Sequence, residues 1–184
     1  MSRFLIIFFI LNFYNQALSS PKNQLISKLK KINNLSFSFK QTIDEKNEKG
    51  KCVIEYPKKN YCEYDNINKK IMVSNGKSLV IKNINSQTYY IYPLKKTPLE
   101  FLLDKDYLIK KMVILEPREI DGKYLNFTIN ENNNIINIFF NKETFNLVGW
   151  QTEDIYQNLV ITFISSVKVN HIINKDIFIL PKND

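Results

Sequence analysis

The feature that most limits the fold of this chain is a period-two alternation of apolar and polar residues that begins at Leu35. In the segment Leu35–Gln41, apolar side chains stand at Leu35, Phe37 and Phe39, with polar ones between them. Successive side chains of a β-strand point to opposite faces, so this pattern predicts a strand with one buried face. Similar segments recur to the end of the chain, which predicts a mainly β protein.

Turn signals separate these segments and join neighbouring ones into hairpins. Cys52–Tyr56 and Tyr61–Tyr64 flank the turn Pro57–Asn60, and Asn75-Gly76 lies between two further apolar runs. Asn-Gly is a strong hairpin signal because both residues tolerate positive φ. Thirteen short segments have this pattern, and we expect them to form about eleven strands. The segments are 35–41, 52–56, 61–64, 71–73, 79–81, 88–92, 112–115, 124–129, 135–140, 147–152, 159–163, 167–170 and 177–180.

Two segments have helical rather than strand-like features. Ser20 can cap a helix that starts at Pro21, and apolar residues at 25, 26, 29 and 32 form one stripe. Thr97-Pro98-Leu99-Glu100 has a cap, a proline at the first helical position and an acid three residues after the cap. The short helix that follows, through Leu103, is apolar nearly all round, so it must cover something apolar. The residues thus predict one antiparallel sheet, curved or folded over, with two helices.

The N-terminus has the pattern of a cleavable signal peptide. Arg3 precedes the apolar run Phe4–Leu11, and Ala17 and Ser19 are small residues at the −3 and −1 positions of a cleavage site. The apolar run is too short to span a bilayer. We expect residues 1–19 to be removed and residues 20–184 to form one soluble domain in the periplasm, although a buried first helix is the alternative reading.

The two cysteines, Cys52 and Cys62, stand five residues either side of Pro57. If Pro57 lies in a turn, they face each other across a hairpin at a spacing that suits a disulfide. An oxidising compartment would let the bond form, and it would contribute about 2–3 kcal/mol. We favour a structural disulfide over two free buried thiols.

Sequence motifs of catalysis and metal binding are absent. There is one histidine, His171, with no second base or metal ligand nearby, and we expect it in a loop or at a strand end. We therefore predict a binding protein with no catalytic residues, no cofactor and no metal, although a secreted hydrolase with an unfamiliar site stays open. The net charge of +8 comes from scattered lysines. Scattered charge in an exported protein gives weak attraction to anionic surfaces, and we expect no nucleic-acid partner.

Several motifs in order resemble the LolA family of lipoprotein carriers. They are Phe37-x-Phe39-x-Gln41 after the first helix, Gly50 before a strand that leads into Tyr56-Pro57, Ser74-Asn75-Gly76-Lys77-Ser78-Leu79, Thr97-Pro98-Leu99 at the start of the lid helix, and Val167-Lys168-Val169-Asn170 followed by Ile177-Phe178. This resemblance, which spans residues 20 to 181, implies an incomplete, unclosed β-barrel with helices over its open side.

The resemblance also implies a function and partners. The protein would be a monomeric chaperone that takes the acyl chains of lipoproteins from an inner-membrane ABC transporter and carries them to an outer-membrane acceptor. Tyr56 stands where the family commonly has an arginine that hydrogen-bonds to the lid, so Tyr56 would supply one hydrogen bond in its place. Asn60 and Cys62 replace a family phenylalanine and tryptophan.

The expected lipid-binding residues lie on the sheet and on the lid. They are Phe37, Phe39, Ile54, Tyr56, Tyr64 and Met72 on the sheet, and Leu99, Leu102 and Leu103 on the lid. Alternation alone cannot distinguish a lined cavity from a filled barrel, so each of these residues has ordinary core as its alternative. A lipid-sensing or regulatory module of the same half-barrel type is the second functional hypothesis.

Overall fold

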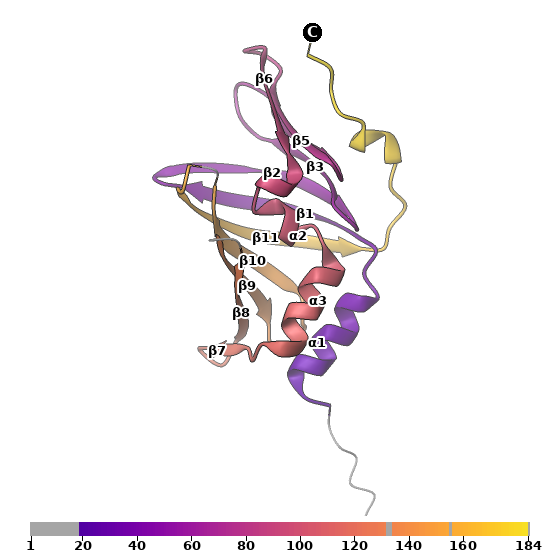
Figure 1. The fold of residues 1–184 in the computed structure, drawn as a ribbon, viewed down its shortest axis with the longest axis vertical. Helices are drawn as coiled ribbons and strands as arrows, with labels where there is room; N and C mark the ends of the chain where they lie inside the picture. Colours follow the sequence, from indigo (N-terminus) through magenta and orange to yellow (C-terminus); the bar gives the residue numbers. More distant parts are fainter. Residues whose placement is uncertain (1–18, 132–133, 155, 184) are drawn as a thin grey trace, which may run out of the picture.

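The computed structural model describes residues 19–131, 134–154 and 156–183, so the predicted signal peptide lies outside it except for Ser19. Its eleven strands form one antiparallel sheet (Figure 1). The strands are β1 (Asn34–Ile43), β2 (Lys46–Glu55), β3 (Lys59–Tyr64), β4 (Lys70–Asn75), β5 (Ser78–Asn83), β6 (Thr88–Pro93), β7 (Arg118–Ile120), β8 (Tyr124–Glu131), β9 (Asn134–Asn141), β10 (Leu147–Glu153) and β11 (Leu159–Val169).

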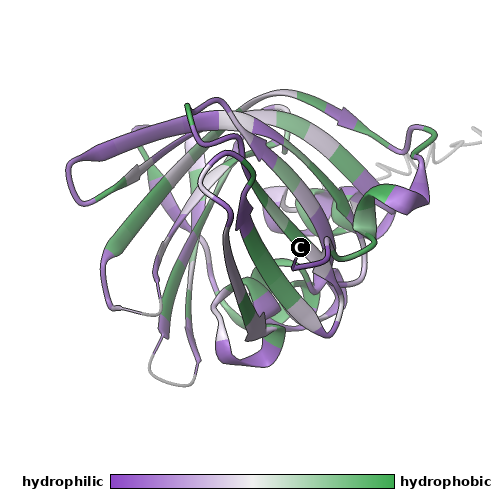
Figure 2. Ribbon diagram, turned by 90° about the horizontal axis from the view of Figure 1, so that it is seen from above, coloured by the Kyte–Doolittle hydropathy of each residue, from purple (hydrophilic) through white to green (hydrophobic). Residues whose placement is uncertain are grey.

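The sheet is curled but not closed, as predicted. Its order is β6-β5-β4-β3-β2-β1-β11-β10-β9-β8-β7, so β6 and β7 form its two edges. β1 pairs with β11 in the middle of the sheet and joins the first and last strands of the domain. Figure 2 shows the strands of the curled sheet fanning round from one edge to the other.

Alternation along the strands decides which side chains reach the concave face. On β1, Leu35, Phe37 and Phe39 are buried, while the serines between them are partly exposed. The Ser74–Lys77 turn forms as predicted between β4 and β5, and Gly76 there has a φ of +95°. This positive φ explains the glycine, because other residues adopt it only with strain.

Four of the helical segments lie over the open side of the sheet. They are α1 (Pro21–Lys30), η1 (Leu94–Lys96), α2 (Leu99–Leu102) and α3 (Lys105–Ile114), whereas the 3₁₀ turn η2 (Lys175–Phe178) lies on the other side, against β3 and β4. The side chain of Ser20 caps α1 by accepting a hydrogen bond from the backbone N–H of Asn23 at 3.3 Å. Among the described residues, no helix is long and apolar enough to cross a membrane.

The predicted strand at Met112–Leu115 is wrong, because Met112–Ile114 form the last turn of α3. Asp104 caps this helix by accepting a hydrogen bond from the N–H of Tyr107 at 3.0 Å. Leu108, Ile109 and Met112 are buried at helical spacing, whereas Ile114 is 79% exposed. A short apolar run fits either structure, and here the cap upstream decides for the helix.

The C-terminal segment also differs from the prediction. The predicted strand at Ile177–Leu180 is instead the 3₁₀ turn η2 followed by extended chain. Only Phe178 of this turn is buried, and it lies against the convex side of β3 and β4, where Lys59 faces its ring. Val167–Asn170 is not a separate strand either, because β11 continues through Val169.

The core of the protein divides into two clusters. The first fills the space between α1, α3 and strands β8 and β9, where Met112, Phe127 and Phe140 are at most 1% exposed. The second lies between β1, β2, β3 and β5 and the lid, and it includes Phe37, Phe39 and Leu103. The two ends of the half-barrel therefore differ in how they are filled.

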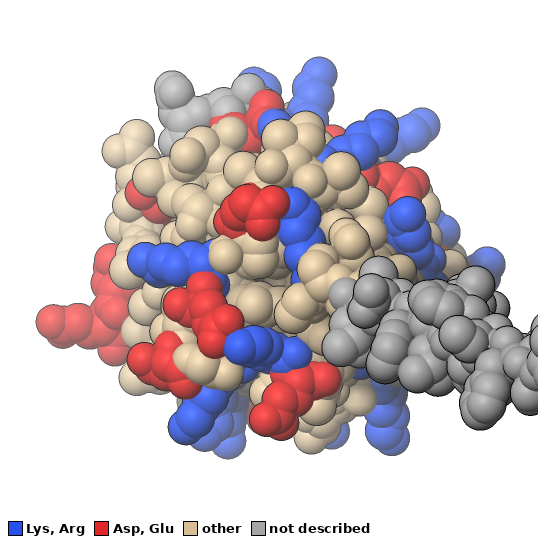
Figure 3. Space-filling model, turned by 90° about the horizontal axis from the view of Figure 1, so that it is seen from below, with Lys and Arg blue, Asp and Glu red and all other residues tan. Residues whose placement is uncertain are grey.

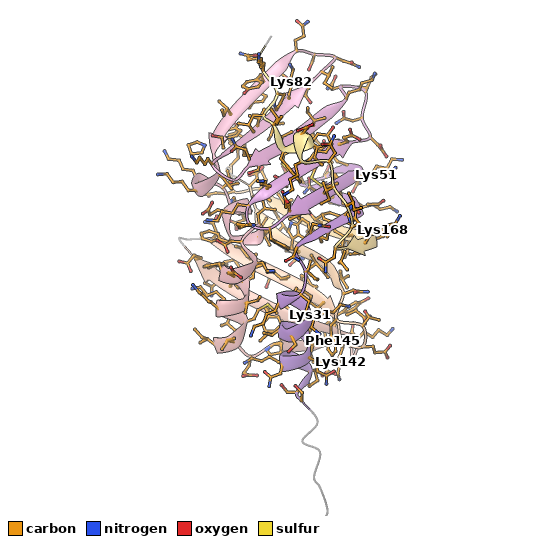
Figure 4. All side chains as sticks on the ribbon, turned by 90° about the vertical axis from the view of Figure 1, so that its right-hand side faces the viewer. Lys31, Lys51, Lys82, Lys142, Phe145 and Lys168 are labelled. Atoms are coloured by element: carbon orange, nitrogen blue, oxygen red, sulfur yellow. A yellow bond between two sulfur atoms is a disulfide. The ribbon has the colours of Figure 1, made fainter. Side chains whose placement is uncertain are left out.

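Charged side chains are spread over the surface. Figure 3 shows acidic and basic side chains interleaved on the lower face of the molecule. Among the ion pairs of the surface, Lys22 pairs with Glu116 and Lys142 with Glu119. The lysines labelled in Figure 4 come from different elements along one side and do not gather in one place. The scattering of lysines predicted from the sequence therefore holds on these faces.

Candidate functional site

A cavity of about 280 Å³ lies on the concave side of the sheet, beneath α2. Its wall includes all nine residues predicted to bind lipid: Phe37, Phe39, Ile54, Tyr56, Tyr64, Met72, Leu99, Leu102 and Leu103. Ligand sites typically have volumes of about 300–1,000 Å³. The cavity is thus just below that range, and larger cargo would need it to widen.

Gly50 lets two aromatic rings of the wall meet. It was predicted to precede a strand but lies inside β2, where it pairs with Phe39 and Tyr64. A Cβ at this position would lie 2.0 Å from the carbonyl oxygen of Glu63 and 2.9 Å from the Phe39 ring. With no side chain between them, the rings of Phe39 and Tyr64 pack edge to face at 5.0 Å. This geometry is a favourable one for aromatic pairs.

A disulfide joins Cys52 on β2 to Cys62 on β3, and both cysteines belong to the cavity wall. The two residues are direct neighbours in the antiparallel register of the hairpin. Since neither carries a free thiol, this part of the wall has no S–H group.

Trp150 on β10 is a wall residue that the sequence reasoning missed. Its ring meets that of Phe37 edge to face at 6.0 Å, so it connects the two halves of the sheet. Thr152 lies two residues further along β10 and also lines the cavity. The period-two rule applied to this strand would have placed both on the concave face. Trp150 is the only tryptophan of the chain, which makes it a reporter of the cavity.

The lid differs from the predicted capping box. The hydroxyl of Thr97 donates to the carbonyl of Leu94 at 2.9 Å and does not cap α2. Glu100 does not reach back to the helix start but pairs with Lys58. α2 is therefore a four-residue helix without a side-chain cap, and it is held mainly by what it contacts.

Lys58, in the turn between β2 and β3, ties the lid to the sheet. Its Nζ lies 2.6 Å from Glu100 Oε1 and 3.3 Å from Asp104 Oδ2, and its backbone N–H donates to the Leu103 carbonyl at 2.7 Å. We call this set of contacts the Lys58 latch. The hydrogen bond to Glu100 raises the pKa of Lys58, so the ammonium keeps its charge.

Tyr56 does not supply the expected hydrogen bond to the lid. Within the described part of the chain, its hydroxyl has no hydrogen-bond partner, and burial raises the pKa of the phenol. Its ring lines the cavity, and the Lys105 Nζ lies 5.8 Å from the ring centroid. The tie between hairpin and lid comes instead from the residue two positions further on.

Polar residues gather at the part of the wall away from α2. Lys70 pairs with Glu48 there, and its Nζ lies 3.8 Å from the centroid of the Tyr64 ring. Gln41 donates to the Thr162 hydroxyl at 2.9 Å. The cavity therefore has an apolar middle and a charged, hydrogen-bonded rim formed by the tips of the strands.

The one histidine of the chain lies outside the cavity. His171 lies in the loop after β11, where its N–H donates to Asn34 Oδ1 at 3.1 Å, and it is not part of the cavity wall. In the described ranges, no group of three or more His, Cys, Asp or Glu residues could hold a metal ion. What the geometry offers is a mainly apolar space covered by a short helix.

One solved structure with a TM-score above 0.5 supports the fold, and two others are similar at lower scores. An uncharacterized conserved protein from Thermus thermophilus superimposes with a TM-score of 0.52 at 7% identity, covering 88% of this chain and 93% of that one. A LolA superfamily protein from Nitrosomonas europaea has a TM-score of 0.45 at 8% identity, with 86% and 98% covered. A putative outer membrane lipoprotein-sorting protein domain from Vibrio parahaemolyticus has a TM-score of 0.49 at 6% identity, with 85% and 95% covered.

Similarity in sequence gives the family. Among curated proteins, none is similar enough to count as a match. The family model described as "Outer membrane lipoprotein carrier protein LolA" matches residues 30–180, which include every strand of the sheet and the lid. With the unclosed eleven-stranded sheet and the cavity beneath α2, this match shows that the chain belongs to the LolA family.

Proposed function

We propose that this protein is a periplasmic carrier that binds the acyl chains of lipoproteins in its cavity. It would take them from an inner-membrane lipoprotein-releasing ABC transporter and carry them to an outer-membrane acceptor. The observation that carries this proposal is the apolar cavity beneath a short helix that polar contacts hold in place. The family match agrees with it.

The physical need for such a carrier follows from the cost of exposing hydrocarbon to water. Burying one methylene of an acyl chain is worth about 0.8 kcal/mol, so a lipoprotein with two or three chains does not cross an aqueous gap unaided. The wall offers Phe37, Phe39, Ile54 and Met72 from the sheet and Leu102 and Leu103 from the lid to these chains. Burial of the chains against these side chains would drive binding.

Reversible binding follows from the lid. Leu102 of α2 and the following Leu103 are 8% and 2% exposed, so the lid already fills part of the concave space. Acyl chains that exceed the volume of the cavity would have to displace α2 and break the Lys58 latch. The free energy of opening offsets part of the gain from burying the chains, and the cargo can then pass on to an acceptor that binds it more tightly.

The proposal is tested by mixing the purified mature protein with a detergent-solubilised triacylated lipoprotein. Co-elution as a one-to-one complex after detergent removal is the expected result. A non-acylated form of the same lipoprotein is the control and should not co-elute. Failure to retain any acylated lipoprotein would refute the carrier function. Binding of free fatty acid without capture of lipoprotein would instead favour the lipid-sensing module.

A further inference from the structure

One polar side chain, Asn60 on β3, lies buried in the otherwise apolar wall of the cavity. It is 2% exposed and shares the inward face of β3 with Cys62 and Tyr64. No described residue donates a hydrogen bond to its Oδ1. A buried acceptor without a partner is unfavourable and calls for an explanation.

The disulfide fixes which way the Asn60 amide faces. Its Nδ2 lies 3.4 Å from Cys62 Sγ. Because Cys62 is bonded to Cys52, this sulfur has no hydrogen and can only accept. Turning the amide round would set oxygen against sulfur, with two acceptors in contact. The nitrogen therefore faces the sulfur, and the oxygen points away from it and has no donor.

The neighbours of Asn60 cannot supply that donor. In register it lies between Ile54, which is apolar, and Ser74. The Ser74 hydroxyl already donates to the Lys58 carbonyl at 2.8 Å and accepts from the Gly76 N–H at 3.1 Å. A water molecule held here would have few polar partners, and buried waters usually make about three hydrogen bonds. Tyr56, whose hydroxyl also has no partner among the described residues of the wall, does not donate to this oxygen either. The structure therefore leaves Asn60 Oδ1 open to a donor on a molecule that enters the cavity.

We infer that Asn60 Oδ1 accepts a hydrogen bond from the cargo, so that the cavity selects acyl chains bearing an N–H or O–H donor. Amide-linked and hydroxylated acyl chains both carry such a group, whereas a plain hydrocarbon chain does not. This inference rests on the proposed function, because it concerns what the same cavity binds. The oxygen is shielded from solvent, and Asn60 belongs to the cavity wall. Cargo that widens the cavity would have to expose it.

A second buried asparagine provides a matched control. Asn126 on β8 is 1% exposed and its Oδ1 also lacks a partner among the described residues. Its side chain is not part of the cavity wall. Replacement of either residue by leucine removes a buried amide whose oxygen has no hydrogen-bond donor. Only the change at Asn60 alters the cavity wall.

The experiment follows Trp150 fluorescence while the mature protein is titrated with matched lipids. One pair is 3-hydroxymyristic acid and myristic acid, and the other is N-myristoylglycine and its ester analogue, which lacks the N–H. Wild-type protein should bind the donor-bearing member of at least one pair about three- to tenfold more tightly. Which pair shows the preference tells the hydroxyl source from the amide source. In Asn60→Leu the preference should vanish, while Asn126→Leu should keep it.

The outcomes separate this inference from the proposed function. If all four lipids bind but neither pair shows a preference, or if Asn60→Leu keeps the preference, the selectivity is refuted and lipid carriage stands. If none of the four lipids nor an acylated lipoprotein binds, the proposed function fails and the inference fails with it. The comparison between paired lipids needs only wild-type protein, so a poorly folded variant would not leave it undecided.

Discussion

Replacing Lys58 with methionine tests whether the Lys58 latch restrains the lid. Methionine keeps the length and apolar stem of the side chain but removes the charge that meets Glu100 and Asp104. The backbone hydrogen bond from residue 58 to the Leu103 carbonyl stays available. The substitution therefore weakens the hold on α2 without removing an apolar wall residue.

The expected magnitude follows from the exposure of the three charged groups. Hydrogen bonds to charged groups contribute about 1.5–3 kcal/mol, and exposed ion pairs only about 0.2–1 kcal/mol. The side chains of Lys58, Glu100 and Asp104 are 29%, 21% and 26% exposed, so the latch falls between these limits, at about 1–2 kcal/mol. The free energy of opening the lid is subtracted from the free energy gained by lipid binding. Lys58→Met should therefore bind myristic acid roughly 5- to 30-fold more tightly than wild type.

Titration of Trp150 fluorescence with myristic acid measures this change. The matched control is Lys59→Met, which removes the neighbouring lysine of the same hairpin, whose Nζ lies 3.2 Å from Glu55 on β2. We expect its affinity to match that of wild type. Equal affinities for all three proteins, or weaker binding by Lys58→Met, would refute the idea that the lid must open against the latch.

Three further predictions concern the lid, the wall and the packing of α3. Leu102→Asp should weaken the lipoprotein complex at least tenfold while the circular dichroism spectrum stays native, and an unchanged complex would rule out the lid assignment. Gly50→Ala should cost about 2 kcal/mol, and lower Tm by about 4–8 °C in calorimetry, because its Cβ meets the Glu63 carbonyl. The hydrogen bond from Lys111, followed by that from Tyr107, lowers the pKa of Glu131. This carboxylate therefore stabilises the fold above its ordinary pKa of 4.5, and the stabilisation is lost as the pH falls through the lowered value. Urea unfolding of Glu131→Gln should show a deficit at pH 7 that closes in acid, and a deficit that is constant with pH would contradict this.

The sheet was predictable because its signals are local. Leu35, Phe37 and Phe39 alternate with serines, and Asn75-Gly76 permits the positive φ of a tight turn. The same local rule explains why all nine expected residues lie on one wall, since side chains two positions apart share a face. The rule failed at short apolar runs without a period, such as the end of α3, because such runs suit either a helix or a strand.

The Lys58 latch and the unpartnered Oδ1 of Asn60 were not predictable, because both depend on contacts between separate segments of the chain. Lys58 and Glu100 are 42 positions apart, and nothing in either segment indicates the other. Tyr56 was the expected partner of the lid by comparison with the family, yet the turn directs Lys58 towards α2 instead. That Asn60 Oδ1 lacks a donor follows only from its surroundings in the fold. The amide nitrogen faces the disulfide sulfur, and the Ser74 hydroxyl donates to the Lys58 carbonyl instead.

The division of the core explains how a lid can move without unfolding the domain. Met112, Phe127 and Phe140 are fully buried between α1, α3 and the strands β8 and β9, and burial of such side chains is worth about 1.5–3 kcal/mol each. This cluster can maintain the fold while the second cluster stays partly hollow. α2 has one turn and no side-chain cap, so little of its own structure resists displacement. Displacement of α2 is resisted instead by the Lys58 latch and by the apolar contacts of Leu103. An acyl chain can make similar apolar contacts in place of those of Leu103. Lipid affinity and domain stability therefore depend on different but overlapping sets of residues, because Leu102 and Phe140 of the first cluster also line the cavity.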